Sequence, residues 1–214
     1  MNINKILENH KNDDFAKSFI QHQNIFLDIY KICNYNFNRK VGSYLFNGKS
    51  YEYYYGMYEK QKLLYDTCRN IEDALEIGTY MGHSLLIMLM SNPKIKVTCI
   101  DIDATYSEPA TKFLQEKFPK AEIIFINANS TDILPKIKKT FDFFHIDGKH
   151  SNKMIEQEFE MCYNMSKDKE IRIIFDDSEF CMPLLEKIKL KFKILEEYTT
   201  SCEYRNTFVK LLKN

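Results

Sequence analysis

Five largely apolar runs that alternate with helical segments constrain the fold of this chain more than any other feature. The runs lie at residues 74–77, 95–100, 121–126, 141–146 and 171–175, and helical patterns at 109–118, 132–139 and 151–165 separate the last four. Strands that alternate with helices form a mostly parallel sheet with helices on both faces. Parallel strands are covered on both sides, which explains their apolar character. We therefore predict an α/β fold.

The last part of the sequence departs from this alternation. A helical segment at 183–189 is followed by two strand-like runs at 192–199 and 207–212, with a short polar link between them. A parallel connection needs a crossover of a dozen or more residues, and this link is too short for one. We expect the last two strands to form an antiparallel hairpin at one end of the sheet.

The first 70 residues are predicted to form a helical cap on a single domain, whose α/β core spans residues 71–214. Residues 1–13 are polar, and we expect them to be loosely packed. Helical spacing predicts one helix from Asp14 to about Cys33 and a second from Glu59 to Cys68. Residues 34–56 are rich in tyrosine, which fits either packing on the domain or a wall that contacts a substrate.

Composition and charge argue against several classes of protein. Lys plus Arg and Asp plus Glu both number 30, so no overall charge favours nucleic acid or an acidic membrane. No run approaches the ~18 apolar residues that would span a bilayer. The polar N-terminus and six scattered cysteines without a Cys-x-x-Cys pair indicate a cytoplasmic protein with reduced thiols. Exposed aromatic residues near the N-terminus would suit a homodimer contact.

The turn from Glu76 to Ser84 is the first candidate binding site. It joins a buried strand to a helix and carries two glycines four residues apart, Gly78 and Gly82. Glycines let backbone N–H groups approach a ligand, and ligands in open α/β sheets bind beyond the carboxyl ends of the strands. Asp101, 25 residues after Glu76, closes the next strand and can accept hydrogen bonds from both ribose hydroxyls. The spacing matches neither a Gly-x-Gly-x-x-Gly nor a P-loop motif, so we expect a cofactor with a ribose and little phosphate.

These residues resemble a known cofactor motif. Glu76-Ile77-Gly78-x-x-x-Gly82 with Asp101 resembles that of class I S-adenosylmethionine-dependent methyltransferases. The segment Asn127 to Pro135 resembles the one after the third strand in catechol-type O-methyltransferases, which implies that Ser130 and Thr131 border the adenine. The resemblance implies a Rossmann-like, seven-stranded sheet and S-adenosyl-L-methionine as cofactor. The cofactor-binding residues that it implies are Glu76, Gly78, Thr79, Tyr80, Gly82, His83, Ser84, Asp101, Ile102, Asn129, Ser130, Thr131 and Asp147.

Three acids at neighbouring strand ends form a candidate metal site. Asp147 closes the fourth strand, and Asp176 and Asp177 close the fifth. Neighbouring carboxylates repel one another, and a bound hard cation would relieve that cost. Oxygen ligands favour Mg²⁺, Mn²⁺ or Ca²⁺ over Zn²⁺. The alternative is that these acids are solvated strand ends or helix caps.

A second resemblance concerns the same acids. Asp147-Gly148-Lys149-His150, followed by Asp176-Asp177, resembles the metal site of divalent-cation-dependent O-methyltransferases, including enzymes that act on the sugars of natural products. The resemblance implies that His150 is the catalytic base and Asp147 a catalytic metal ligand, with Lys149 as the other candidate base. His145 lies within an apolar strand and is expected to be a hydrogen-bonded core residue.

The function expected from the sequence is methyl transfer from S-adenosylmethionine to a hydroxyl of a small molecule or sugar, assisted by a divalent cation such as magnesium. One alternative is a metal-independent methyltransferase acting on nitrogen or oxygen, in which the Asp pair is structural. Another is a protein that binds S-adenosylmethionine without catalysis. Three converging acids argue against the latter, since simple binding does not require them.

Overall fold

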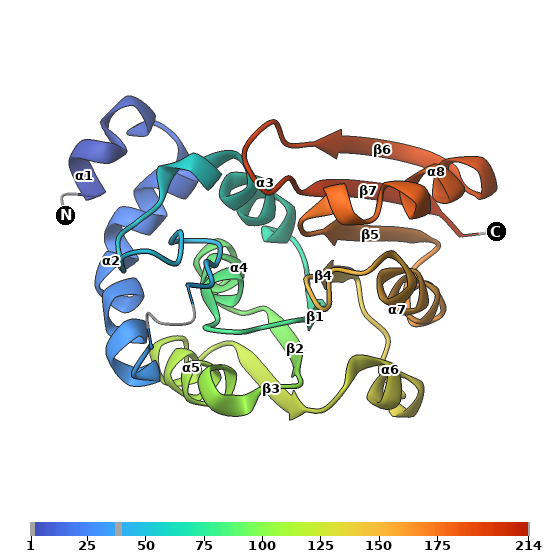
Figure 1. Cartoon of the computed structure of the whole chain (residues 1–214), viewed down its shortest axis with the longest axis horizontal. Coiled ribbons are helices and arrows are strands. Elements are labelled where there is room, and N and C mark those ends of the chain that lie inside the picture. Colours follow the sequence, from blue (N-terminus) through green and yellow to red (C-terminus); the bar gives the residue numbers. More distant parts are fainter. Residues whose placement is uncertain (1–2, 37–39, 214) are drawn as a thin grey trace.

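The computed structural model describes residues 3–36 and 40–213 and contains a seven-stranded sheet in the order β3-β2-β1-β4-β5-β7-β6 (Figure 1). The first five strands pair in parallel. The seventh strand pairs antiparallel with both the fifth and the sixth. The predicted sheet and its C-terminal hairpin are therefore confirmed. The strands are β1 (Asp73–Ile77), β2 (Lys96–Asp101), β3 (Glu122–Asn127), β4 (Phe143–Ile146), β5 (Glu170–Phe175), β6 (Lys193–Thr199) and β7 (Thr207–Leu212).

Helices cover both faces of the sheet, each above its own apolar core (Figure 1). Successive β1 residues point to opposite faces, so Ala74 joins one core and Leu75 the other. One face carries α2 (Asp14–Cys33), α3 (Tyr58–Cys68), α4 (His83–Ser91) and α5 (Ala104–Lys117). The other carries α6 (Ser130–Ile133), α7 (Asn152–Asn164) and α8 (Met182–Lys191). No helix among the described residues is long and apolar enough to cross a membrane.

The N-terminal residues are packed rather than loose, so that expectation was wrong for the described part. A short helix, α1 (Ile3–Ile6), is followed by a 3₁₀ turn at Glu8–His10. Ile3 and Leu7 are buried in the same core as Phe15. Their spacing of four residues places both on one helical face, which explains why a mostly polar segment still packs.

Two helix starts in the core were misplaced because side-chain caps were overlooked. Helix α5 begins at Ala104, well before Pro109, since the Asp103 side chain accepts a hydrogen bond from Thr105 N (2.9 Å). Helix α6 begins at Ser130 because the Asn129 side chain caps it, and a 3₁₀ turn at Leu134–Lys136 ends the segment. Asp and Asn are favoured caps because their oxygens satisfy the first free N–H groups of a helix.

The tyrosine-rich segment packs on the domain, as one of the two readings of its sequence predicted, and its contact with a substrate stays a prediction. Tyr53 and Tyr58 are buried in the core, and a 3₁₀ turn at Tyr55–Met57 leads into α3. Tyr44 is also buried, but its ring lines a cavity at the carboxyl ends of the strands. Residues 40–44 thereby close one side of that cavity.

Candidate active site

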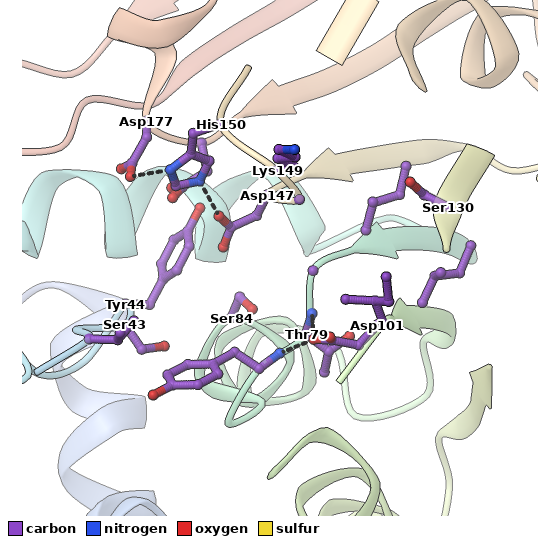
Figure 2. A pocket seen from close by; sticks show the side chains of 18 of the residues that line it. Ser43, Tyr44, Thr79, Ser84, Asp101, Ser130, Asp147, Lys149, His150 and Asp177 are labelled. Atoms are coloured by element: carbon purple, nitrogen blue, oxygen red, sulfur yellow. Dashed lines mark hydrogen bonds and ion pairs between the residues drawn. The ribbon is translucent and has the colours of Figure 1, made fainter. Parts of the chain in front are cut away.

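A cavity of about 830 Å³ lies at the carboxyl ends of β1, β2, β4 and β5 (Figure 2). Asp101 and Ser130 lie on one side of it, and Asp177 and His150 on the other, with Asp147 between them. The parallel strands explain this gathering, because their carboxyl ends share one edge of the sheet. The volume is in the range of small-molecule sites in proteins.

The glycine turn and the Asp147 loop are in direct contact at the floor of this cavity. Gly78 has φ +86°, and a Cβ there would lie 1.9 Å from the Asp147 carbonyl oxygen. Gly78 N donates to Ile100 O (2.8 Å), and Asp147 N donates to Ile77 O (2.8 Å). Glycine is therefore required at this position both for its backbone angle and for its lack of a side chain.

Asp101 holds the turn in place from the end of β2. Its Oδ2 accepts hydrogen bonds from Thr79 N (3.0 Å) and Tyr80 N (2.7 Å), and its Oδ1 accepts one from Asp103 N (2.9 Å). Asp101 also lines the cavity, as do Gly78, Thr79, Tyr80, Ser84 and Ile102. The position suits the ribose contact expected from the sequence, which stays a prediction.

The expected adenine end of the cavity contains Asn129 and Ser130, together with Glu158, which the sequence did not reveal as a site residue. The Ser130 hydroxyl donates to Glu158 Oε1 (2.5 Å), and burial raises the pKa of Glu158. Thr131 is expected to border the adenine but does not line the cavity. Its N and Oγ1 instead donate to the capping Asn129 side chain (3.2 and 3.1 Å).

Two other expected cofactor residues are buried behind the cavity wall. Glu76 Oε1 accepts a hydrogen bond from Ser84 Oγ (2.6 Å), so Glu76 supports Ser84 from below. His83 points into the aromatic core, where its Nε2 lies 2.8 Å from the Tyr51 hydroxyl, and burial lowers its pKa to about 3. The structure thus does not place His83 at the expected contact with the cofactor; as the first residue of α4, it faces away from the cavity. Gly82 does not line the cavity either.

The three predicted metal ligands converge at the opposite end of the cavity. His150 bridges two of them: its Nε2 lies 3.4 Å from Asp147 Oδ1, and its Nδ1 lies 3.3 Å from Asp177 Oδ2 (Figure 2). Lys60, from α3, lies 2.8 Å from Asp176 Oδ1 through its Nζ and 3.6 Å from Asp177 Oδ1. The acids therefore face a lysine on one side and a histidine on the other.

The proximity of these acids shifts their ionisation. Burial and the neighbouring Asp176 raise the pKa of Asp147 well above its usual range, and the same two causes raise the pKa of Asp177 to about 6. Burial also opposes ionisation of Asp176, but the Lys60 ammonium, His145 and the hydrogen bonds to Lys60 and Asp147 together outweigh burial and lower the pKa of Asp176. Asp147 and Asp177 thus carry the cost of like charges in a confined space.

The two histidines near the acids differ in exposure: His150 is part-exposed and His145 is buried. Phe180 stacks on the His150 ring, with centroids 5.5 Å apart, and leaves that ring part-exposed to the cavity. Lys149 lies exposed on the same loop. His145 is buried and lies 2.6 Å from the Tyr44 hydroxyl through its Nε2, which is the core role expected for it.

Comparison with known proteins supports the fold and identifies a methyltransferase domain. Residues 75–178 match a family model described as a methyltransferase domain. The structure is similar to the O-methyltransferase TomG from Streptomyces achromogenes, solved with S-adenosylmethionine (18% identity, 72% of this chain, 80% of TomG, TM-score 0.59). It is also similar to the methyltransferase PaMTH1 from Podospora anserina, solved with S-adenosylhomocysteine (10% identity, 89% of this chain, 88% of PaMTH1, TM-score 0.65). The chain therefore contains a methyltransferase domain and has the fold of S-adenosylmethionine-dependent methyltransferases.

The acid cluster of this methyltransferase is suited to a divalent cation. Ligand atoms of His150, Asp176 and Asp177 lie within 4.8 Å of one another, and so do those of His145, Asp147 and Asp176. The donors are mainly carboxylate oxygens, which hard cations such as Mg²⁺ prefer. The Lys60 ammonium faces Asp176 and Asp177 only, and a bound divalent ion would favour the ionised form of all three acids.

The sequence did not reveal three residues of the methyltransferase site: Lys60, Tyr44 and Glu158. Lys60 had a usable signal, because it lies four residues before the buried Leu64 on the inner face of α3. Glu158 likewise lies between the buried Ile155 and Phe159 on the inner face of α7. Tyr44 had no such signal, since the irregular segment around it has no periodicity.

Proposed function

We propose that this methyltransferase transfers the methyl group to a hydroxyl oxygen of a small molecule or sugar, with a divalent cation held by Asp147, Asp176 and Asp177. The observation that carries the proposal is the convergence of these acids with His150, across the cavity from Asp101 and Ser130. The donor and the acceptor would each occupy one end of the same cavity.

The residues of the chain have separable roles in this mechanism. Asp101 and Ser130 would hold the adenosine, and Ser84 the amino-acid part of the donor. A bound cation would hold the acceptor oxygen and make its hydroxyl more acidic. His150 faces the cavity and would take the hydroxyl proton, because its ring lies between Asp147 and Asp177, next to the place of the proposed cation. Lys149 is the second candidate base.

The proposal that the acceptor is an oxygen atom of a small molecule is supported by the site. The fold does not support it, because the same fold also occurs in an N-methyltransferase. NodS from Bradyrhizobium japonicum, an N-methyltransferase, is also similar in structure (11% identity, 74% of this chain, 96% of NodS, TM-score 0.55). A cation site made mainly of carboxylates favours an oxygen acceptor, since hard cations bind oxygen. TomG is involved in tomaymycin synthesis, and the present cavity of about 830 Å³ fits a cofactor with a small acceptor. The even charge balance gives no electrostatic support for nucleic acid.

A second candidate is a methyltransferase that needs no metal. The observation that favours it is the buried Lys60, which already places one positive charge against Asp176 and Asp177. In this version the acids and Lys60 form a structural ion cluster, and positioning of the acceptor alone supplies catalysis.

Transfer of a labelled methyl group distinguishes these versions. The protein is incubated with labelled S-adenosylmethionine and a panel of hydroxylated small molecules and sugars, in Mg²⁺ or in EDTA. We expect labelled ether products in Mg²⁺, a rate at least tenfold lower in EDTA, and recovery when Mg²⁺ is restored. Undiminished transfer in EDTA would establish the metal-free version. Binding of S-adenosylhomocysteine without any labelled product would indicate a non-catalytic binder.

A further inference from the structure

Lys60 is a buried cation among the proposed metal ligands. Its side chain is 3% exposed, and its Nζ lies 2.8 Å from Asp176 Oδ1 and 3.6 Å from Asp177 Oδ1. The same Nζ lies 4.5 Å from the centroid of the Tyr44 ring. Lysine rarely occupies such positions unless its ammonium is paired, because burial removes its hydration.

The lysine and the histidine approach the acids from different elements. Lys60 extends from α3 and contacts both residues of the Asp176–Asp177 pair. His150, on the loop after β4, contacts Asp147 and Asp177 and remains part-exposed. Solvent therefore reaches the acids on the side of His150, whereas Lys60 occupies their buried side.

We propose that Lys60 is the resident counter-ion of the Asp147, Asp176 and Asp177 cluster and limits how tightly the cluster binds a divalent cation. The inference rests on the proposed function only for the identity of the ion. Two like charges at this range repel strongly where water is excluded, so a fixed ammonium disfavours an incoming cation. It also occupies an oxygen of Asp176 that the cation would otherwise use. Lys60 thus keeps the cluster folded without metal and makes the metal exchangeable.

Three substitutions on one helix test this role. Lys60→Met removes the charge and keeps an unbranched apolar stem, whereas Lys60→Arg keeps the charge. Lys62→Met is the matched control, because Lys62 is part-exposed on the same helix and pairs with Asp13 and Asp66. The probe is Mn²⁺ alone, titrated by calorimetry and by the electron paramagnetic resonance signal of the free ion. Thermal unfolding is recorded with Mn²⁺ and with EDTA.

We expect Lys60→Met to bind Mn²⁺ at least tenfold more tightly than the unchanged protein. Lys60→Arg and Lys62→Met should remain within about threefold of it. In EDTA, Lys60→Met should unfold at a lower temperature than Lys62→Met, and Mn²⁺ should raise its unfolding temperature more. If Lys60→Met is unfolded in EDTA, folding on addition of Mn²⁺ supports the proposal, and failure to fold with Mn²⁺ overturns it. Equal or weaker Mn²⁺ binding by folded Lys60→Met also overturns it.

The result is independent of whether the unchanged protein needs metal. If the unchanged protein binds no Mn²⁺ but Lys60→Met does, the metal-dependent mechanism fails while the role of Lys60 stands. If the unchanged protein binds Mn²⁺ and Lys60→Met binds it no better, the role of Lys60 fails while the metal site stands. Tight binding by Lys60→Arg would show that the amine geometry, not its charge, is responsible, and would also contradict the proposal.

Discussion

The Asp101 carboxylate serves the backbone and the cavity together. Its Oδ2 accepts hydrogen bonds from Thr79 N and Tyr80 N, so it shapes the turn that borders the expected donor site. It also lines the cavity, where a ribose would meet it. A change at Asp101 should therefore affect cofactor affinity more strongly than a change at a nearby acid that only caps a helix.

Asp101→Asn is predicted to raise the Kd for S-adenosylhomocysteine by about 10- to 100-fold, because hydrogen bonds to charged groups are worth about 1.5–3 kcal/mol. Isothermal titration calorimetry measures this directly. Asp103→Asn is the control, since asparagine caps a helix as well as aspartate does. Equal affinities for the two variants would remove Asp101 from the binding site.

Metal affinity is predicted to rise with pH. The pKa of Asp177 is raised to about 6, so a cation must displace a proton from Asp177 below that pH. The proton displaced from Asp177 should make the Kd for Mn²⁺ fall by about tenfold per pH unit as pH rises from 5 to 6, and this contribution should level off above 7. The pKa of Asp147 is also raised, so Asp147 adds a displaced proton of its own. Calorimetry in buffers of different ionisation enthalpy counts the released protons. A Kd that is independent of pH would contradict this prediction.

The same shifts affect stability in the absence of metal. A carboxyl whose pKa is higher in the folded state than in the unfolded state binds more protons when folded. The contribution of Asp177 to folding stability should therefore decrease as pH rises from its ordinary pKa of 3.8 to about 6. Lys60 opposes this loss, because it stabilises the ionised acids beside it.

At the residue scale, the sequence predicted the acids better than their partners. Asp101, Asp147, Asp176 and Asp177 follow apolar runs, and the parallel sheet brings such strand ends to one edge. Lys60 was missed because a single lysine in an amphipathic helix resembles any surface lysine. Only its position on the buried face of α3 distinguishes it.

At the scale of elements, the turn after β1 and the loop after β4 depend on each other. The Gly78 turn rests on the Asp147 carbonyl, so the donor end and the acid end of the cavity share one backbone contact. The spacing of Gly78 and Gly82 predicted a turn, but it could not predict the contact, which depends on the pairing of β1 with β4.

Gly78→Ala is predicted to destabilise the protein by at least about 3 kcal/mol, because strain at positive φ adds to a clash with backbone. Gly82→Ala should cost only about 1–2 kcal/mol. Its φ is +70°, but its Cβ would meet the flexible Leu114 side chain at 3.1 Å. Urea unfolding of both variants measures the difference. A smaller loss for Gly78→Ala than for Gly82→Ala would refute the close approach of the two loops.

Element boundaries show where local chemistry was misread. The apolar runs predicted the strands well, since burial on both faces leaves a clear pattern. The start of α5 was misplaced because Pro109 was given more weight than the Asp103 cap. The packing of Ile3 and Leu7 was missed because two buried residues in a polar segment leave a weak signal.

At the scale of the whole molecule, the fold places two chemically different ends in one cavity. The end bounded by Asp101 and Ser130 has hydrogen-bonding groups suited to a nucleoside, and the other end contains Asp147, Asp177 and His150 (Figure 2). Asp176 and Lys60 line the same end. The N-terminal segment completes the second end, since both Tyr44 and Lys60 precede β1. The α/β core alone would thus lack part of the proposed acceptor site.

A crystal structure of the protein with S-adenosylhomocysteine and Mn²⁺, with anomalous diffraction recorded for manganese, tests the central claim most directly. We predict adenosine against Asp101 and Ser130, and one manganese peak bound by Asp147, Asp176 and Asp177. The homocysteine sulfur should point toward the manganese, because the transferred methyl group must reach the acceptor there. A ligand bound outside this cavity, or no manganese at the acids at saturating Mn²⁺, would contradict the account.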